Sequence, residues 1–174
     1  KMGRKTNQAE LKERIGALRK AMPDIAIRTT LIVGFPQESE EEFRELLDFV
    51  EEMQFERLGV FTYSQEEGTA AARMDGQIDE DAKQERKDQV MALQKDISAK
   101  YCQKFVGKTV RVLVEGKLPE DEMYCGRTVQ DAPDIDGMVF FRAEEAPLSG
   151  DFVTVKITEA IDYDLIGDVV YADE

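Results

Sequence analysis

The sequence predicts an α/β segment followed by an all-β domain. Before residue 106, three stretches repeat apolar residues every three or four positions, which is typical of helices, and two apolar runs lie between them. After residue 107 the apolar residues recur at every second position and glycines separate the runs, a pattern typical of short strands in a small barrel or sandwich. We therefore expect one boundary, with residues 1–106 as the α/β part and residues 107–174 as the β domain.

The three predicted helices span residues 7–21, 39–53 and 79–105. Thr6 or Asn7 is a suitable cap for the first helix, and Pro23 ends it. Ser39 begins the second helix and forms a capping box with Glu42, three residues later. The third helix opens in a charged stretch, and its apolar face is present only in its second half.

The two runs between the helices, residues 25–33 and 58–63, are apolar on both faces, as in parallel strands covered by helices. The alternation of helix and strand predicts a piece of an α/β fold. Two strands can neither close a barrel nor complete a doubly wound sheet, so we expect this part to be a fragment of a larger fold. In the β domain we expect about five short strands, with the clearest patterns at residues 109–114, 138–141, 152–157 and 165–170.

Charge is distributed unevenly along the 174 residues. The formal net charge is −14, of which residues 1–106 carry −4 and the shorter β domain carries −10. Such a domain repels nucleic-acid phosphates and attracts a basic partner, although acidity can also serve solubility alone. Histidine is absent, which excludes a Ser-His-Asp triad, a Cys-His pair and an imidazole metal site.

The ends of the two predicted parallel strands are the natural place for a ligand. In α/β folds ligands bind just outside the carboxyl ends of strands, and Gly34 allows a backbone to approach a ligand closely. Tyr63 ends the second strand, so we expect it on the same rim as Gly34. The alternatives are an ordinary strand-to-helix turn at Gly34 and a Tyr63 side chain that only covers the edge of the core.

The remaining chemistry of the sequence is sparse. Cys102 and Cys125 form neither a disulfide framework nor a metal-ligand set, so we interpret both as structural or incidental. No apolar run is long enough to span a membrane, and no export signal is evident. We therefore expect a cytoplasmic protein.

Taken in order, the motifs resemble the C-terminal half of a radical S-adenosylmethionine methylthiotransferase. In the α/β part the matching segments are Met2-Gly3-Arg4, residues 30–39 (TLIVGFPQES) and residues 61–71 (FTYSQEEGTAA). The β part resembles a TRAM domain at residues 107–108, 112–116, 126–128, 150–155 and 163–167. The resemblance implies the C-terminal portion of a partial (β/α)6 barrel, with a linker helix, joined to a small antiparallel β-barrel.

That family has two relevant branches. One modifies an adenosine of tRNA, and the RimO-type branch adds a methylthio group to the β-carbon of an aspartate in a small-subunit ribosomal protein. Residues 27–30 (IRTT) and 132–137 (APDIDG) resemble the RimO-type branch, and the loop at residues 64–69 is acidic where tRNA-modifying members tend to be basic. The resemblance thus implies a basic ribosomal protein as the partner and no membrane. The alternatives are the tRNA enzyme and a non-catalytic protein-binding module.

The resemblance also implies cofactors, namely S-adenosylmethionine (SAM) and two 4Fe–4S clusters. The CxxxCxxC triplet of the first cluster and the three cysteines of the second are missing from this sequence. We therefore expect a fragment that is inactive alone and has no catalytic or metal-binding residue of its own. At residues 37 and 39, Gln and Ser replace the more common Gly and Thr of the family's GFPGET segment.

Individual site residues are carried over from the family's late barrel strands, which wall the SAM pocket. The residues implied to line this pocket are Ile32, Gly34, Phe35 and Tyr63. Arg28 and Thr30 are implied to face the barrel interior and bind the cofactor or, alternatively, contact the substrate loop. Three acidic residues of the TRAM-like domain are implied to dock the basic partner: Glu115, Asp134 and Asp136.

Overall fold

The computed structural model describes residue 3, residues 5–119 and residues 122–171. Met2 and Arg4 of the matching N-terminal segment lie outside the described residues. Contacts divide the chain into two compact units, Lys1–Ile97 and Ser98–Glu174. The division falls inside a long helix, nine residues before the boundary expected at residue 106, which stays a prediction.

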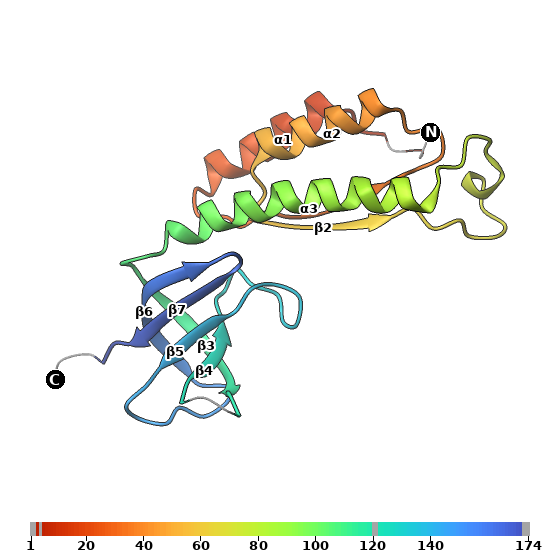
Figure 1. Ribbon diagram of the computed structural model, residues 1–174. Helices are drawn as coiled ribbons and strands as arrows, with labels where there is room; N and C mark the ends of the chain where they lie inside the picture. Colours follow the sequence, from red (N-terminus) through yellow and green to blue (C-terminus); the bar gives the residue numbers. More distant parts are fainter. Residues whose placement is uncertain (1–2, 4, 120–121, 172–174) are drawn as a thin grey trace. The chain divides into compact units, whose positions relative to one another are not determined.

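The first unit alternates helices and strands, as predicted (Figure 1). Its elements are α1 Gln8–Ala21, β1 Arg28–Val33, α2 Glu40–Met53, β2 Arg57–Thr62, the short 3₁₀ helix η1 Ala71–Arg73, and α3 Glu80–Gln103, which continues into the second unit. The helix caps are confirmed. The Asn7 side chain accepts the Glu10 N–H, and Ser39 and Glu42 exchange both bonds of a capping box.

The strand β1 begins at Arg28, not at residue 25. The chain first makes a turn in which the Ile25 N–H bonds the Met22 carbonyl, and the Ile27 N–H bonds the Glu56 carboxylate. These two N–H groups are thus bonded outside the ladder, and before Arg28 it is the Ile27 carbonyl that bonds β2, where it accepts the Arg57 N–H at 3.3 Å.

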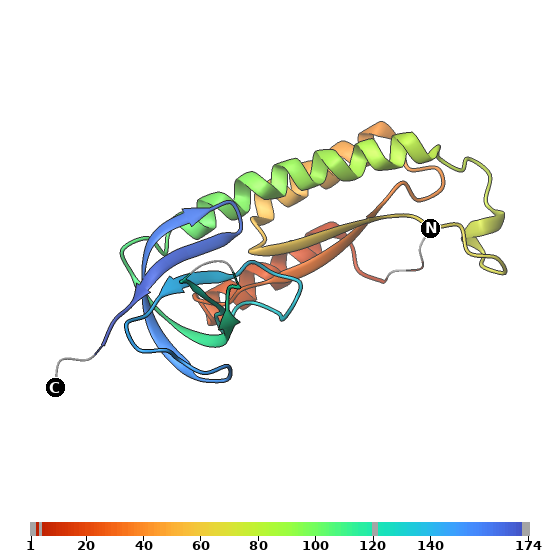
Figure 2. The same cartoon turned by 60° about the horizontal axis from the view of Figure 1, so that its bottom comes forward.

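The two strands lie side by side and pair in parallel (Figure 2). In their register Ile32 lies opposite Phe61. One face of this sheet packs against α2 and α3, and the central core residues there are Val33, Val60, Phe43, Val50, Val90 and Ile97. The expectation that helices cover both faces is wrong for the described residues, because Ile32 is 43% exposed and Phe61 62% exposed. The apolar pattern on both sides of these strands therefore marks one packed face and one open face.

The second unit is a closed barrel, which confirms the predicted small β-barrel. Its strands are β3 Thr109–Lys117, β4 Tyr124–Arg127, β5 Val139–Arg142, β6 Phe152–Ile161 and β7 Asp164–Val169, joined in the order β3-β4-β5-β7-β6. All pairs are antiparallel except β5 with β7. The parallel pair arises because β6 intervenes in the chain, so β7 enters beside β5 in the same direction.

The barrel core is made by alternate residues of the strands together with the end of α3. Buried members include Val112, Val114, Phe141, Val155 and Ile157. Cys102, on the last turn of α3, is 2% exposed and belongs to this core, which accords with a structural role. The helix ends at Gln103, two residues earlier than expected, because the N–H groups of the next three residues bond carbonyls three positions back instead of four. Gly107, with φ +82°, then turns the chain toward β3.

Gln54 ends α2 in the left-handed conformation, with φ 48° and ψ 58°. Glycine adopts this conformation without the strain that a Cβ imposes. We expect Gln54→Gly to raise the free energy of unfolding of the first unit by up to about 1 kcal/mol, measured by urea denaturation. A decrease in stability would show that the bond from the Gln54 side chain to the Glu51 carbonyl outweighs the strain.

Candidate functional site

The open face of the two-stranded sheet presents three of the predicted site residues. Arg28, Thr30 and Ile32 alternate along β1 and are all exposed. On β2, Gly59 lies opposite Thr30 and Phe61 lies opposite Ile32. The open face thus combines a guanidinium, a hydroxyl and two apolar side chains, with bare backbone at Gly59, and could form one wall of a pocket for an amphipathic ligand.

The other three predicted residues gather at the carboxyl ends of the strands. The Tyr63 N–H donates to the Val33 carbonyl at 2.8 Å, which confirms that Tyr63 and Gly34 share one rim. The rings of Phe35 and Tyr63 meet edge to face with centroids 5.3 Å apart. Arg28 lies at the opposite end of β1. At about 3.3 Å per residue it is about 20 Å along the strand from Gly34, so the two cannot contact the same small group.

The space beside Gly34 is filled by a side chain that sequence reasoning missed. Gly34 has φ +75°, and a Cβ there would overlap the Lys83 side chain. Lys83 is 2% exposed, its ammonium bonds Glu80 at 2.5 Å, and it lies 5.4 Å from the centre of the Tyr63 ring. The charged opening of α3 gave no sign that one lysine of the stretch is buried.

A second buried cation, Arg86, holds the loop that follows Gly34. Its Nη1 donates to the Glu38 carboxylate at 2.8 Å and to the Glu38 carbonyl at 3.1 Å, and its Nη2 bonds Glu40. Burial disfavours the charged guanidinium, but the bonds to Glu40 and Glu38 outweigh it and raise the pKa of Arg86. The arginine therefore stays charged and keeps the loop tied to α3.

The strand ends offer one polar atom to a ligand. The Tyr63 hydroxyl is buried and has no hydrogen-bond partner among the residues that the structure describes. A buried hydroxyl without a partner is costly, so this atom fits a site that a polar group of a ligand completes.

Ligation of an iron–sulfur cluster requires a different set of side chains, chiefly cysteine thiolates. Within the described ranges, no group of three or more His, Cys, Asp or Glu residues could hold a metal ion. Burial, and then the Glu115 carboxylate, raise the pKa of the Cys125 thiol, so the thiolate that binds iron is scarce at neutral pH. The described residues therefore do not supply a ligand set for a cluster.

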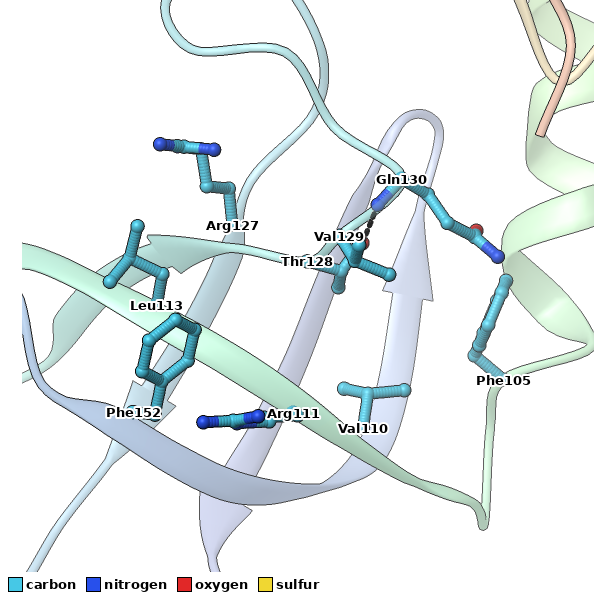
Figure 3. A pocket seen from close by; sticks show the side chains of 9 residues that line it. All are labelled: Phe105, Val110, Arg111, Leu113, Arg127, Thr128, Val129, Gln130 and Phe152. Carbon is cyan, nitrogen blue, oxygen red and sulfur yellow. Dashed lines mark hydrogen bonds between the residues drawn. The ribbon is translucent and has the colours of Figure 1, made fainter. Parts of the chain in front are cut away.

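The barrel carries a largely apolar groove of about 660 Å³, shown in Figure 3. Its lining includes Val110, Leu113, Val129 and Phe152, with Arg111 and Arg127 as the cations. The Arg111 guanidinium lies 4.0 Å from the centre of the Phe152 ring. The groove thus combines apolar contact area with two guanidinium groups in a domain that is otherwise acidic.

The three acidic residues expected to dock a partner differ in their surroundings. Glu115 bonds Arg127 at 2.8 Å, and the Asp136 carboxylate accepts the Ala132 N–H at 2.7 Å within its own loop. Asp134 is exposed and has φ +60°. Of the three, Asp134 is the carboxylate most open to an approaching protein.

None of the described helices has the length and apolar character to cross a membrane.

Both units are similar in sequence to known proteins. Residues 106–170 match the TRAM domain family. The chain is 50% identical over 167 residues to "Ribosomal protein uS12 methylthiotransferase RimO" of Lachnoclostridium phytofermentans, covering 96% of this chain and 38% of the relative. Proteins of the same name from Clostridioides difficile and Geobacter sulfurreducens are 46% and 47% identical, each over 98% of this chain and 38% of the relative.

The chain thus spans about two fifths of the length of the relatives that it matches. The similarity extends through both units, and the barrel and the α/β unit have the folds that the resemblance implies. The chain therefore belongs to the RimO family of methylthiotransferases, corresponds to the C-terminal part of its members, and carries a TRAM domain over residues 106–170.

Proposed function

We propose that this chain acts as part of a methylthiotransferase that replaces a hydrogen on the β-carbon of an aspartate of ribosomal protein uS12 with a methylthio group. The similarity to proteins named for that activity, over nearly the whole chain, is the observation that carries the proposal. SAM and two iron–sulfur clusters would supply the radical chemistry and the methylthio group when bound, because acid–base side chains cannot break an unactivated C–H bond.

The residues of this chain bind and shield rather than react. Thr30, Ile32 and Phe61 on the open face would wall the SAM pocket, and the Tyr63 hydroxyl would bond a polar group of the ligand. The cysteine ligands of the clusters are not present in this sequence, so the chain alone is inactive. A cytoplasmic location, beside newly made ribosomal proteins, suits the whole enzyme.

The barrel would dock the basic substrate protein. Its net charge of −10 supports uS12 as the partner over tRNA, because a phosphate backbone is repelled by such a domain. Asp134, exposed on the loop between β4 and β5, is the carboxylate that we propose for the first contact.

A salt series of binding measurements with purified uS12 and, separately, tRNA tests the docking role. We expect uS12 to bind and its affinity to fall at least about tenfold as ionic strength rises from about 0.01 to 1 M, over which the Debye length shrinks from about 30 to 3 Å. Asp134→Asn should weaken binding at low salt several-fold. The matched control is Asp81→Asn, which removes an exposed carboxylate from α3 and should leave binding unchanged. If the affinity for uS12 changes neither with ionic strength nor with Asp134→Asn, the docking role is wrong.

A tRNA substrate is the second candidate, and one observation favours it. Arg111 stacked on Phe152, with Arg127 in the same groove, could hold an unpaired base and its phosphate. If tRNA alone binds, and Arg111→Ala abolishes that binding, the assignment moves to the tRNA-modifying branch.

A further inference from the structure

Two buried cations of α3 lie under the proposed cofactor site without being part of the lining residues. Lys83 and Arg86 are three positions apart, so they project from the same face of the helix. They are 2% and 7% exposed. Burying two cations on one helix face costs free energy unless hydrogen bonds and ion pairs compensate for the lost hydration. The contacts of Lys83 and Arg86 therefore identify the segment that the two side chains stabilise.

Arg86 closes a ring of hydrogen bonds around the loop after β1. The Gly34 N–H donates to the Glu38 carboxylate at 3.1 Å, and Arg86 donates to that carboxylate and to the Glu38 carbonyl. The Glu38 N–H also bonds the Phe35 carbonyl at 2.9 Å. The guanidinium thus fixes Glu38 through two bonds, as its fork geometry allows, and the Glu38 carboxylate in turn holds the Gly34 end of the loop.

Lys83 holds the other side of the same loop. Its aliphatic stem lies against the Gly34 backbone, where a Cβ would overlap it, and its ammonium lies over the Tyr63 ring. Tyr63 in turn packs on Phe35. The position of the Tyr63 hydroxyl, the buried atom that lacks a partner among the described residues, therefore depends on Lys83.

We propose that Lys83 and Arg86 are positioning residues that shape the Gly34–Glu38 loop and orient Tyr63 for SAM. This inference rests on the proposed function, since it takes SAM as the ligand of the strand ends. The start of α3 would thereby contribute to the affinity for SAM, although neither Lys83 nor Arg86 is among the residues proposed to line the pocket.

The test has one arm that needs no cofactor. Amide hydrogen exchange is measured on the whole 174-residue chain carrying Lys83→Met, which keeps an unbranched apolar stem, or Arg86→Lys, which keeps the charge without the fork. We expect exchange of the Gly34 and Glu38 amides to rise at least about tenfold. Their bonds to the Glu38 carboxylate and the Phe35 carbonyl break more often once Arg86 no longer fixes Glu38 or Lys83 no longer packs on Gly34. The amides of Val50 and Val60, in the core, should not change. Lys95→Met, an exposed lysine on the same helix, is the matched control and should leave every rate as in the parent.

The second arm uses the complete methylthiotransferase and compares KM with kcat. We expect each variant to raise the KM for SAM about tenfold and to change kcat less than twofold, since the residues act through the loop and touch no reacting atom. Unchanged exchange at Gly34 and Glu38 overturns the proposal, as does faster exchange with an unaltered KM. A parent enzyme that does not use SAM would instead refute the proposed function, and the exchange arm would still decide whether these cations hold the loop.

Discussion

Replacing Gly167 with alanine should destabilise the barrel by about 3 kcal/mol, the upper end of the usual cost of overpacking. Gly167 lies in β7, where a Cβ would overlap the Lys156 carbonyl oxygen of β6 and lie 2.8 Å from a methyl group of Val155. The obstructing atom is backbone in a paired strand, so it cannot move aside as a flexible side chain could. Relief of the overlap would require β6 and β7 to separate, which breaks the hydrogen bonds between them.

Urea denaturation followed by circular dichroism measures this effect. Gly116→Ala is the matched control, because Gly116 lies in β3 of the same barrel and a Cβ there would meet nothing within 4 Å. We expect the control to unfold within about 0.5 kcal/mol of the parent. Equal stability of the two alanine variants would show that β6 and β7 can be spread without penalty.

Truncating Phe141 to alanine should cost the barrel about 4 kcal/mol. The side chain is 0% exposed, stacks on Tyr124 with ring centroids 5.8 Å apart, and lies opposite Gly167 in the sheet. Its removal loses buried apolar area and leaves a cavity that a closed barrel cannot collapse around. A small domain has only about 5–15 kcal/mol of total stability, so this loss takes a large share of it.

The same denaturation experiment checks the prediction, with Phe152→Ala as its control. Phe152 is 58% exposed on β6, so its truncation should cost less than about 1 kcal/mol even though it loses the contact with Arg111. A Phe141 variant as stable as the Phe152 variant would mean that the barrel core repacks freely.

Much of the fold was accessible from local patterns. The capping residues Asn7 and Ser39, the two apolar strands and the period-two alternation after residue 107 each depend on neighbours close in sequence, and the structure has each of them. The sequence pattern does not predict β4, Tyr124–Arg127, because four residues carry too little alternation to indicate a strand.

Some residues of the candidate site could likewise be predicted from the sequence, and others could not. Gly34, Phe35 and Tyr63 could be expected together, since parallel strands end at a common rim and the glycine marks the turn. The separation of Arg28 from this rim follows from strand length, which the sequence pattern also contained. Lys83 and Arg86 could not be found, because nothing in a run of charged helical residues distinguishes a buried cation from a solvated one.

The sequence by itself determined the alternation of helices and strands, the small β-barrel, the acidic charge of the second part and the family, because each follows from local periodicity, composition or the order of motifs. Only the tertiary structure decided which face of β1 and β2 is open, which carboxylates of the barrel are already bonded, and which two cations of α3 are buried under the strand ends. The burial of the two cations depends on contacts between residues almost 50 positions apart, Lys83 with Gly34 and Arg86 with Glu38, and no local pattern encodes such contacts. The open face and the bonded carboxylates likewise depend on how the strands and loops pack, which periodicity and composition do not specify.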